Sequence, residues 1–209
     1  VIQEIIRKAF PTHSILGEEG ESMRDNHAPC WIVDPIDGTV NFTHGLPIWC
    51  SSVAVQIDGQ TAAGAIMLPM MDECYAASCA GPATLNEDII QVSDTDSMDR
   101  ALVISGLPKD MRTNQVSQDL FQRVLMSARR TRILGAAAAD MCFVASGAAD
   151  AYIERGIYTW DVAAGDLIVR RAGGRTRISP LSDGESGRLA CLCSNPALFD
   201  DVTQIADSE

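Results

Sequence analysis

Two carboxylates, Asp34 and Asp37, stand three residues apart just after a short apolar run. Residues 30–33 predict a buried strand, and Pro35 should end it because proline has no N–H to donate to a strand ladder. Two close carboxylates repel each other unless a divalent cation lies between them, and oxygen ligands of this kind suit Mg²⁺ or Mn²⁺. Asp, Pro and Gly are also common turn residues, so these positions alone slightly favour an ordinary surface turn.

Gly38 and Thr39 follow the second carboxylate directly, and Thr39 is a plausible start for a helical turn. The start of a helix exposes free N–H groups and a positive dipole end, which suit a phosphate group. A hard metal beside such an anion-binding backbone is what metal-assisted phosphate hydrolysis needs. An aspartyl-phosphate enzyme more typically has one residue between its two aspartates, so the two residues here disfavour that alternative.

Three further acidic positions could belong to the same chemistry. Glu18 and Glu19 lie between glycines, Glu154 ends an apolar run, and Asp161 precedes a helical pattern. Each has an ordinary structural explanation: a solvated turn for the glutamate pair, and the N-cap of the following helix for Asp161. Taken alone, the N-cap is the favoured interpretation of Asp161.

The elements that must position these side chains alternate between strands and helices. Helical spacing is found in residues 1–9, 115–130, the stretch from 139 to 147, and 162–173, with a last short helix after Pro196. Strand patterns are found in residues 50–58, 61–68, 72–79, 89–92, 101–105, 151–154 and 189–193. We predict one domain over residues 1–209, with an antiparallel sheet in residues 1–96, a connector around 93–99, and an α/β part in 97–209.

Composition excludes several classes of function. The net charge of −12 makes nucleic acid a poor ligand, and no apolar run approaches the length of a membrane span. The seven cysteines form no paired framework, so we expect core packing, a reducing setting and a cytoplasmic location. The three histidines lie far from any cysteine pair with zinc-finger spacing, so a zinc site is not expected.

Two long motifs carry a resemblance to a known family. The run WIVDPIDGTVNFTHGLP at residues 31–47 and the run WDVAAG at 160–165, followed by AGG at 172–174, resemble the two hallmarks of the inositol monophosphatase family. The GEE of residues 17–19 resembles the acidic loop of that family. The three occur in the family's order, and the resemblance covers nearly the whole chain.

The resemblance implies a role for each matching residue. Glu18, Asp34 and the Ile36 carbonyl would hold one Mg²⁺, and Asp34, Asp37 and Asp161 a second, with a third, weaker ion shared by Glu18. The backbone N–H groups of Gly38 and Thr39 would bind the phosphate, and Thr39 and Glu18 would position the attacking water. Ala137, Ala138 and Glu154 stand where the family contacts the hydroxyl groups of the substrate.

The resemblance also implies the fold and the setting of the protein. The family has a layered α/β/α/β/α sandwich, is often a homodimer, and is inhibited by lithium in many members. Its members carry two more helices ahead of the helix at residues 1–9, so we expect those helices to be missing from this chain, which begins at Val1. Ala80-Gly81-Pro82-Ala83 and Arg170-Arg171 depart from the family pattern outside the metal set.

We therefore predict Mg²⁺-dependent hydrolysis of inositol monophosphate, a small-molecule phosphomonoester, with no nucleic-acid or membrane partner. Two alternatives stay open. The first is a related sugar phosphatase acting on fructose 1,6-bisphosphate or histidinol phosphate. The second is a non-catalytic metal-binding or partner protein of the same fold.

Overall fold

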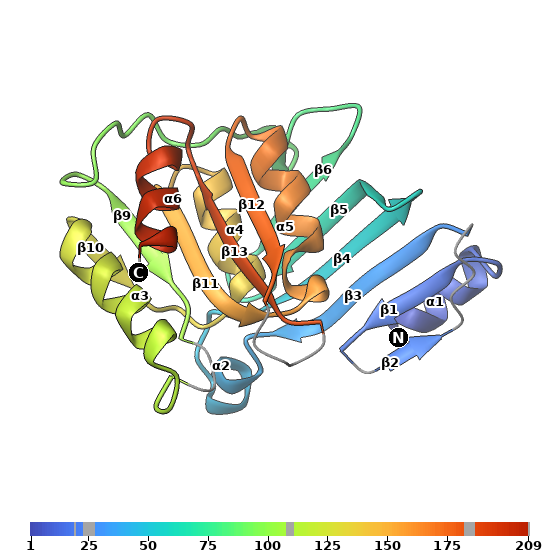
Figure 1. The fold of residues 1–209 in the computed structure, drawn as a ribbon. Helices are drawn as coiled ribbons and strands as arrows, with labels where there is room; N and C mark the ends of the chain where they lie inside the picture. Colours follow the sequence, from blue (N-terminus) through green and yellow to red (C-terminus); the bar gives the residue numbers. More distant parts are fainter. Residues whose placement is uncertain (19, 23–27, 108–110, 182–186, 209) are drawn as a thin grey trace.

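The structure, a computed structural model, describes residues 1–18, 20–22, 28–107, 111–181 and 187–208. Its described residues form two β-sheets and six helices stacked in layers (Figure 1). None of these helices is both long enough and apolar enough to cross a bilayer.

The first sheet holds strands from the N-terminal half of the chain. Its spatial order is β2-β1-β3-β4-β5-β6-β7-β8, and all neighbours are antiparallel except β1 and β3. The strands are β1 Ser14–Gly17, β2 Gly20–Ser22, β3 Cys30–Asp37, β4 Cys50–Ile57, β5 Gln60–Leu68, β6 Glu73–Ser78, β7 Thr84–Leu85 and β8 Asp88–Ile89. Asp58 and Gly59 form the turn of the β4–β5 hairpin, which confirms the hairpin predicted there.

The second sheet holds strands from the C-terminal half. Its order is β10-β9-β11-β13-β12, with a parallel β10-β9-β11 part and antiparallel β13 and β12. The strands are β9 Leu102–Ser105, β10 Arg130–Arg132, β11 Ala151–Ile157, β12 Arg175–Pro180 and β13 Leu189–Ser194.

The helices separate and cover the two sheets. They are α1 Ile2–Ala9, α2 Thr39–His44, α3 Gln115–Ser127, α4 Ala137–Ala145, α5 Thr159–Arg171 and α6 Phe199–Asp207. Helices α4 and α5 form the central layer, α1 covers the outer face of the first sheet, and α3 and α6 cover the outer face of the second (Figure 1). The predicted α/β/α/β/α sandwich is therefore confirmed.

Alternation along the strands assigns each side chain to a layer. In β11, Tyr152 packs in the central core, whereas Ile153 packs against α3 and α6. In β3, Ile32 faces the central core and Val33 faces Ile6 of α1. Cys191 and Cys193 also face the central core, as predicted, and all seven cysteines are free thiols.

Several predicted element boundaries were wrong. Pro35 does not end its strand, because β3 continues to Asp37. The strand expected at 89–92 is limited to β8, and the helix expected to reach residue 130 ends at Ser127. Strands β1, β2, β7, β10 and β12 were not predicted. Arg175–Pro180 is charged and contains proline, so it lacks the apolar signal of a buried strand.

Candidate active site

The predicted functional residues gather around one cavity of about 640 Å³. It lies where the end of β3, the start of α5, the start of α4 and the end of β11 meet. The predicted residues that line it are Glu18, Asp34, Ile36, Asp37, Gly38, Thr39, Ala137, Glu154 and Asp161. Ala138, also predicted, is fully buried and does not line it.

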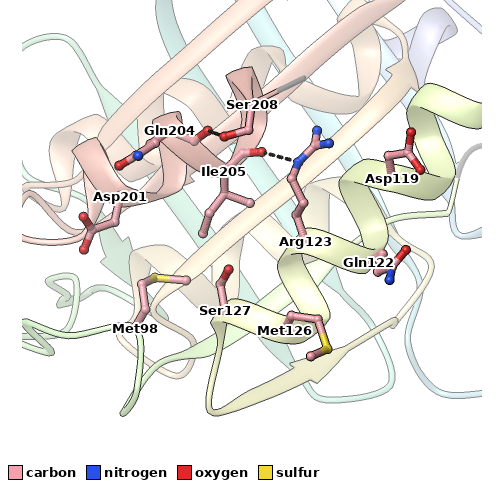
Figure 2. Close-up of a pocket in the computed structure, with 10 residues that line it drawn as sticks. All are labelled: Met98, Asp119, Gln122, Arg123, Met126, Ser127, Asp201, Gln204, Ile205 and Ser208. Carbon is pink, nitrogen blue, oxygen red and sulfur yellow. Dashed lines mark hydrogen bonds between the residues drawn. The ribbon is translucent and has the colours of Figure 1, made fainter.

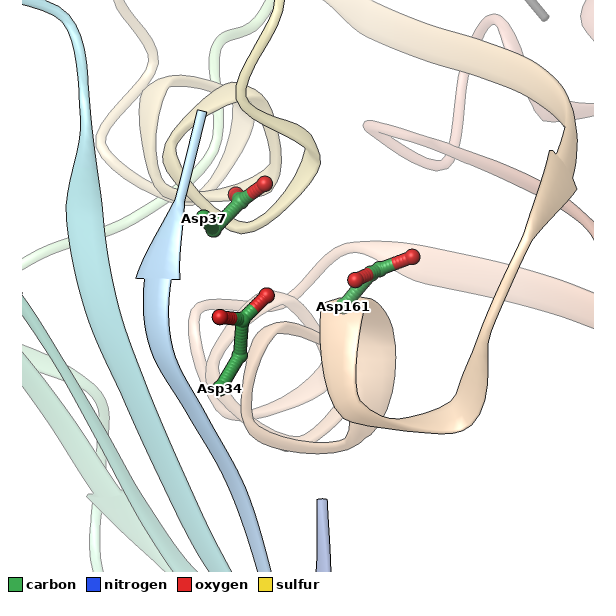
Figure 3. A group of neighbouring side chains, drawn as sticks. All are labelled: Asp34, Asp37 and Asp161. Atoms are coloured by element: carbon green, nitrogen blue, oxygen red, sulfur yellow. The ribbon is translucent and has the colours of Figure 1, made fainter. Parts of the chain in front are cut away.

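Three carboxylates form a compact group at this cavity. One oxygen each from Asp34, Asp37 and Asp161 lies within 4.8 Å of the other two, and Figure 3 shows the three side chains as neighbours. Asp34 and Asp37 come from the first sheet, and Asp161 comes from the central helical layer. No other group of three or more candidate metal ligands was found among the described residues.

A β-bulge at Pro35 places both aspartates of β3 on one face. In a regular strand, residues three apart point to opposite faces. Here Asp34 pairs with Ser52 and Asp37 with Cys50, so two residues of β3 lie opposite the single residue Ser51. The extra residue restores the same orientation for both carboxylates. The bulge also explains why Pro35 is tolerated inside a strand, since the ladder is already interrupted there.

Two donors hold the Asp37 carboxylate. The N–H of Ala138 donates to Asp37 Oδ2 over 2.7 Å, and the Cys50 thiol contacts the same oxygen at 3.6 Å. Ala138 is thus used to orient Asp37 from the first turn of α4. This places Ala137, not Ala138, at the cavity wall.

Asp161 is the third residue of α5, not its N-cap as predicted. Helix α5 begins at Thr159 with Tyr158 as N-cap, and Asp161 Oδ2 accepts a hydrogen bond from the Tyr158 N–H over 2.7 Å. This is the reciprocal half of a capping box, which satisfies a donor at the helix start. The same bond fixes the direction of the carboxylate toward Asp34 and Asp37.

Helix α2 begins at the cavity wall beside Asp37. Gly38 is its N-cap with φ of +82°, a left-handed conformation that glycine adopts without strain. Thr39 Oγ1 donates to the Ile36 carbonyl over 3.0 Å, and that oxygen keeps a second lone pair. The amides of Gly38 and Thr39 therefore lie at a short helix start next to the carboxylates.

Glu154 lies in the middle of β11 and also lines the cavity. Its Oε2 accepts a hydrogen bond of 2.6 Å from the hydroxyl of Tyr152. Glu18, at the end of β1, is exposed and lines the cavity near Asp34, whereas Glu19 lies outside the described residues.

Burial without a cationic partner raises the proton affinity of these carboxylates. Burial first, and then the charge of Asp34, raise the pKa of Asp37 to about 7. Burial raises the pKa of Glu154 to about 6. Burial likewise raises the pKa of Asp161, and burial together with the Glu18 charge raises that of Asp34. Among the ion pairs of the described residues, none involves these four carboxylates.

A second cavity, of about 730 Å³, lies between α3 and α6 (Figure 2). Arg123 lines it, but the Nε of that side chain donates to the Ile205 carbonyl over 3.0 Å. Its two carboxylates, Asp119 and Asp201, belong to no candidate metal group among the described residues. Of these two cavities, only the one at Asp34 contains a group of candidate metal ligands among the described residues.

The family follows from a match along most of the chain. The model of the inositol monophosphatase family matches residues 1–191. The chain belongs to the inositol monophosphatase family. The resemblance inferred from the two sequence motifs is thus confirmed.

Curated relatives of the family match at moderate identity. An inositol-1-monophosphatase from Synechocystis is 38% identical over 98% of this chain and 72% of its own length. A protein named Nus factor SuhB from Xylella fastidiosa is 39% identical over 83% of this chain. The match spans only 63% of that relative.

Solved structures of the family share the whole described fold. The inositol monophosphatase from Anabaena (Nostoc) sp. PCC 7120 is 34% identical with a TM-score of 0.89, covering 98% of this chain and 82% of that one. A structure described as inositol monophosphate bound SaIMPase-II is 27% identical with a TM-score of 0.85, covering 97% and 77% of the two chains.

The residues at the cavity beside Asp34 fit divalent metal ions. Three carboxylates from two layers converge within 4.8 Å, and no described cation offsets their charge. All the donors are oxygens, which suits Mg²⁺ or Mn²⁺ better than a soft metal. Burial first, and then the charge of Asp34, raise the pKa of Asp37, and an ion at this point would offset the second of these causes.

Sequence reasoning missed residues that support the site. Cys50 was assigned to core packing, yet it contacts Asp37; Gly106 and Tyr152 had no assigned role. Asn41 donates from Nδ2 to the carbonyls of Ile48 and Leu134, each over 2.7 Å, and so ties α2 to the segment before α4. The sequence contained a signal for Asn41, because this residue lies inside the first motif. It contained no signal for Cys50, Gly106 or Tyr152.

Proposed function

We propose that this protein hydrolyses phosphate monoesters of polyols with the help of Mg²⁺, and that inositol monophosphate is its substrate. The observation that carries this proposal is the juxtaposition of the Asp34–Asp37–Asp161 group with the start of α2 in one cavity. A metal group beside exposed amides suits a phosphate, and Glu154 in the same cavity suits a hydroxyl group.

The proposed metal ligands are those implied by the sequence motifs. Asp34, Asp37 and Asp161 would hold the ions, with Glu18 and the Ile36 carbonyl completing a set for two or three of them. When bound, the ions would neutralise the phosphate, lower the pKa of a bound water and stabilise the leaving alkoxide.

The remaining side chains would bind and orient the reactants. The N–H groups of Gly38 and Thr39 would donate to phosphate oxygens, and the Thr39 hydroxyl with Glu18 would orient the attacking water. The Glu154 carboxylate would accept a hydrogen bond from a substrate hydroxyl. No protein side chain needs to become phosphorylated in this scheme.

The ranking of substrates rests on Glu154 and on one relative. The solved structure described as inositol monophosphate bound indicates that a related protein holds this ester. Fructose 1,6-bisphosphate and histidinol phosphate are the alternative substrates. A panel of the three esters ranks them, and a clear preference for the bisphosphate would place that ester first instead.

The deciding experiment is phosphate release from inositol 1-phosphate with and without Mg²⁺, using wild-type protein and Asp161→Asn. We expect Mg²⁺-dependent turnover that the substitution abolishes. Asp119→Asn, a carboxylate of α3 in the second cavity, is the matched control and should keep full activity. Turnover by Asp161→Asn equal to that of the control would contradict the metal assignment.

A second candidate function is a partner protein of the same fold without turnover. It is favoured by relatives that carry the name Nus factor SuhB. Mg²⁺ binding in calorimetry, with no phosphate release from any ester of the panel, would support it. Homodimerisation, a cytoplasmic location and lithium inhibition stay predictions. Light scattering tests homodimerisation, and a lithium titration of phosphate release tests the inhibition.

A further inference from the structure

Two neighbours lie against the Glu154 carboxylate. One is Tyr152, two residues earlier on β11, and the other is Gly106, which directly follows β9. β9 and β11 are parallel neighbours, and the Gly106 N–H donates to the Ile153 carbonyl over 3.1 Å. Both residues therefore reach Glu154 from the rigid frame of the second sheet.

Tyr152 supplies a fixed hydrogen-bond donor. Residues two apart on a strand share a face, so its ring and the Glu154 side chain leave β11 on the same side. The ring is fully buried in the central core, and its hydroxyl donates to Glu154 Oε2 over 2.6 Å. A buried ring has little freedom, so this donor fixes the position of one carboxylate oxygen.

Gly106 supplies the space in which the carboxylate lies. A Cβ atom at this position would stand 1.8 Å from Glu154 Cδ, and 1.9 and 2.3 Å from its two oxygens. Its φ is not in the left-handed region, so the backbone itself would accept alanine. The carboxylate of Glu154 is what requires a glycine here.

The other oxygen of Glu154 remains for a ligand. No hydrogen bond to Oε1 is found among the described residues, and this atom is not one of the enclosed, unpartnered polar atoms. Gly106 and Glu154 both line the cavity that contains the three aspartates. The carboxylate is therefore oriented by the protein on one side and open to the cavity on the other.

We propose that Tyr152 and Gly106 are positioning residues that hold Glu154 ready to accept a hydrogen bond from a substrate hydroxyl, and that they thereby set the preference for polyol phosphates. This inference rests on the proposed function and deepens it. A fixed acceptor discriminates by affinity against an ester that lacks the matching hydroxyl.

The test compares Tyr152→Phe with wild type on inositol 1-phosphate and on p-nitrophenyl phosphate, which has no polyol hydroxyl. We expect KM for inositol 1-phosphate to rise about 5- to 10-fold with kcat within about twofold, because the substitution weakens substrate binding in the ground state and the transition state alike. The kinetics with p-nitrophenyl phosphate should be unchanged.

Tyr75→Phe is the matched control. Tyr75 is also a buried tyrosine, and its hydroxyl donates to Glu73 Oε2 over 2.8 Å on β6, away from the cavity. Tyr75→Phe should lose about as much thermal stability as Tyr152→Phe and keep the wild-type KM for both esters. Equal kinetics in the two variants would overturn the inference.

A double-mutant cycle separates positioning from general damage. In the Glu154→Ala background, Tyr152→Phe should cause no further rise in KM, since the group that it positions is gone. Additive effects of the two substitutions would overturn the inference.

Gly106→Ala tests the space requirement, with Gly81→Ala as its control. At Gly81 a Cβ would meet only Ser78 Oγ at 3.7 Å, so that variant should behave as wild type. Gly106→Ala should raise KM for inositol 1-phosphate at least as much as Tyr152→Phe. Unchanged KM in Gly106→Ala would contradict the role of the glycine.

These outcomes are distinguishable from failure of the proposed function. If wild-type protein with Mg²⁺ releases phosphate from neither ester, the proposed function fails and the inference falls with it. If wild type is active and Glu154→Ala raises KM while Tyr152→Phe does not, only the inference fails. If Tyr152→Phe impairs both esters equally, its role is structural and the inference is also overturned.

Discussion

Asp37 joins three different features of the molecule through one carboxylate. It belongs to the acidic group, accepts the Ala138 N–H at the start of α4, and contacts the Cys50 thiol. Burial raises its pKa to about 7, so without an ion it holds a proton at pH values where an ordinary aspartate does not. The site therefore stores repulsion that a divalent cation would relieve.

Asp34→Asn should separate function from stability. Turnover should fall about a thousandfold or more, because a shared metal ligand is lost. The metal-free variant should melt about 2–4 °C above metal-free wild type if the lost repulsion is worth about 1 kcal/mol. Phosphate release and thermal melts in EDTA check the two parts, and a lower melting temperature in EDTA would contradict the stored repulsion.

The stability of the metal-free protein should fall as pH rises. The unfolded Asp37 carboxyl titrates near its ordinary value of 3.8, whereas burial raises the folded pKa to about 7. Between these values the folded state binds more protons than the unfolded state, so the free energy of unfolding decreases with pH and the contribution of Asp37 is lost above about pH 7. Urea melts in EDTA at pH 5.5 and 8 check this, with Asp37→Asn as the variant that should reduce the difference.

At the scale of elements, short segments join the layers around the cavity. Helix α2 has only one buried residue, Asn41, so it cannot be held by an apolar face. The Asn41 side chain instead donates to carbonyls before β4 and before α4. The amides at the start of α2 thus keep their place relative to α4, whose own amide binds Asp37.

Asn41→Ala should lower both stability and turnover. Two carbonyls lose their donor, which should cost about 1–3 kcal/mol, and the start of α2, the proposed phosphate site, loses its anchor. Asn86→Ala is the control: its side chain bonds the Cys74 N–H and the Asp72 carbonyl, each over 2.8 Å, away from the cavity. Thermal melts with phosphate release should show stability losses in both variants and an activity loss only in the first.

The strands and helices could be predicted in part, and the reasons differ by element. Helix α1 and the β4–β5 hairpin carry clear periodicity and turn residues, so sequence located them. The short strand β1 and the charged strand β12 depend on partners elsewhere in the sheet, which no local pattern reveals. The site residues were identified through two motifs, but the bulge at Pro35 and the donors from Cys50 and Tyr152 arise from pairing across distant segments.

At the scale of the whole molecule, the acidic group connects two layers of the sandwich. Asp34 and Asp37 belong to the first sheet, and Asp161 belongs to the central layer, where Ile168 of the same helix is fully buried. Ser52 of β4 also donates to the Trp160 carbonyl over 3.4 Å, beside Asp161. An ion bound by all three aspartates would add a direct link between these two layers.

Mg²⁺ should therefore raise the melting temperature of the whole chain. A ligand at about 100 times its Kd stabilises the folded state by about 2.7 kcal/mol. EDTA should reverse the shift, and Asp161→Asn should abolish most of it. Ile168→Ala should lower the free energy of unfolding by about 2–5 kcal/mol, and so lower the melting temperature both with and without Mg²⁺. This variant should keep the Mg²⁺-induced shift. Calorimetric melts with and without Mg²⁺ check all three, and an equal Mg²⁺ shift in Asp161→Asn would contradict the bridge between layers.

The bulge in β3 links the orientation of the two carboxylates to the number of residues between them. Asp34 pairs with Ser52 and Asp37 with Cys50, so two aspartates three residues apart share a face only because one residue between them is surplus to the pairing. Losing Pro35 or Ile36 singly would leave a regular strand with both carboxylates still on one face. Regular pairing with both residues kept would instead turn one carboxylate toward the layer of α1, beside Val33. The shared orientation of the two aspartates thus depends on their spacing and on the bulge together.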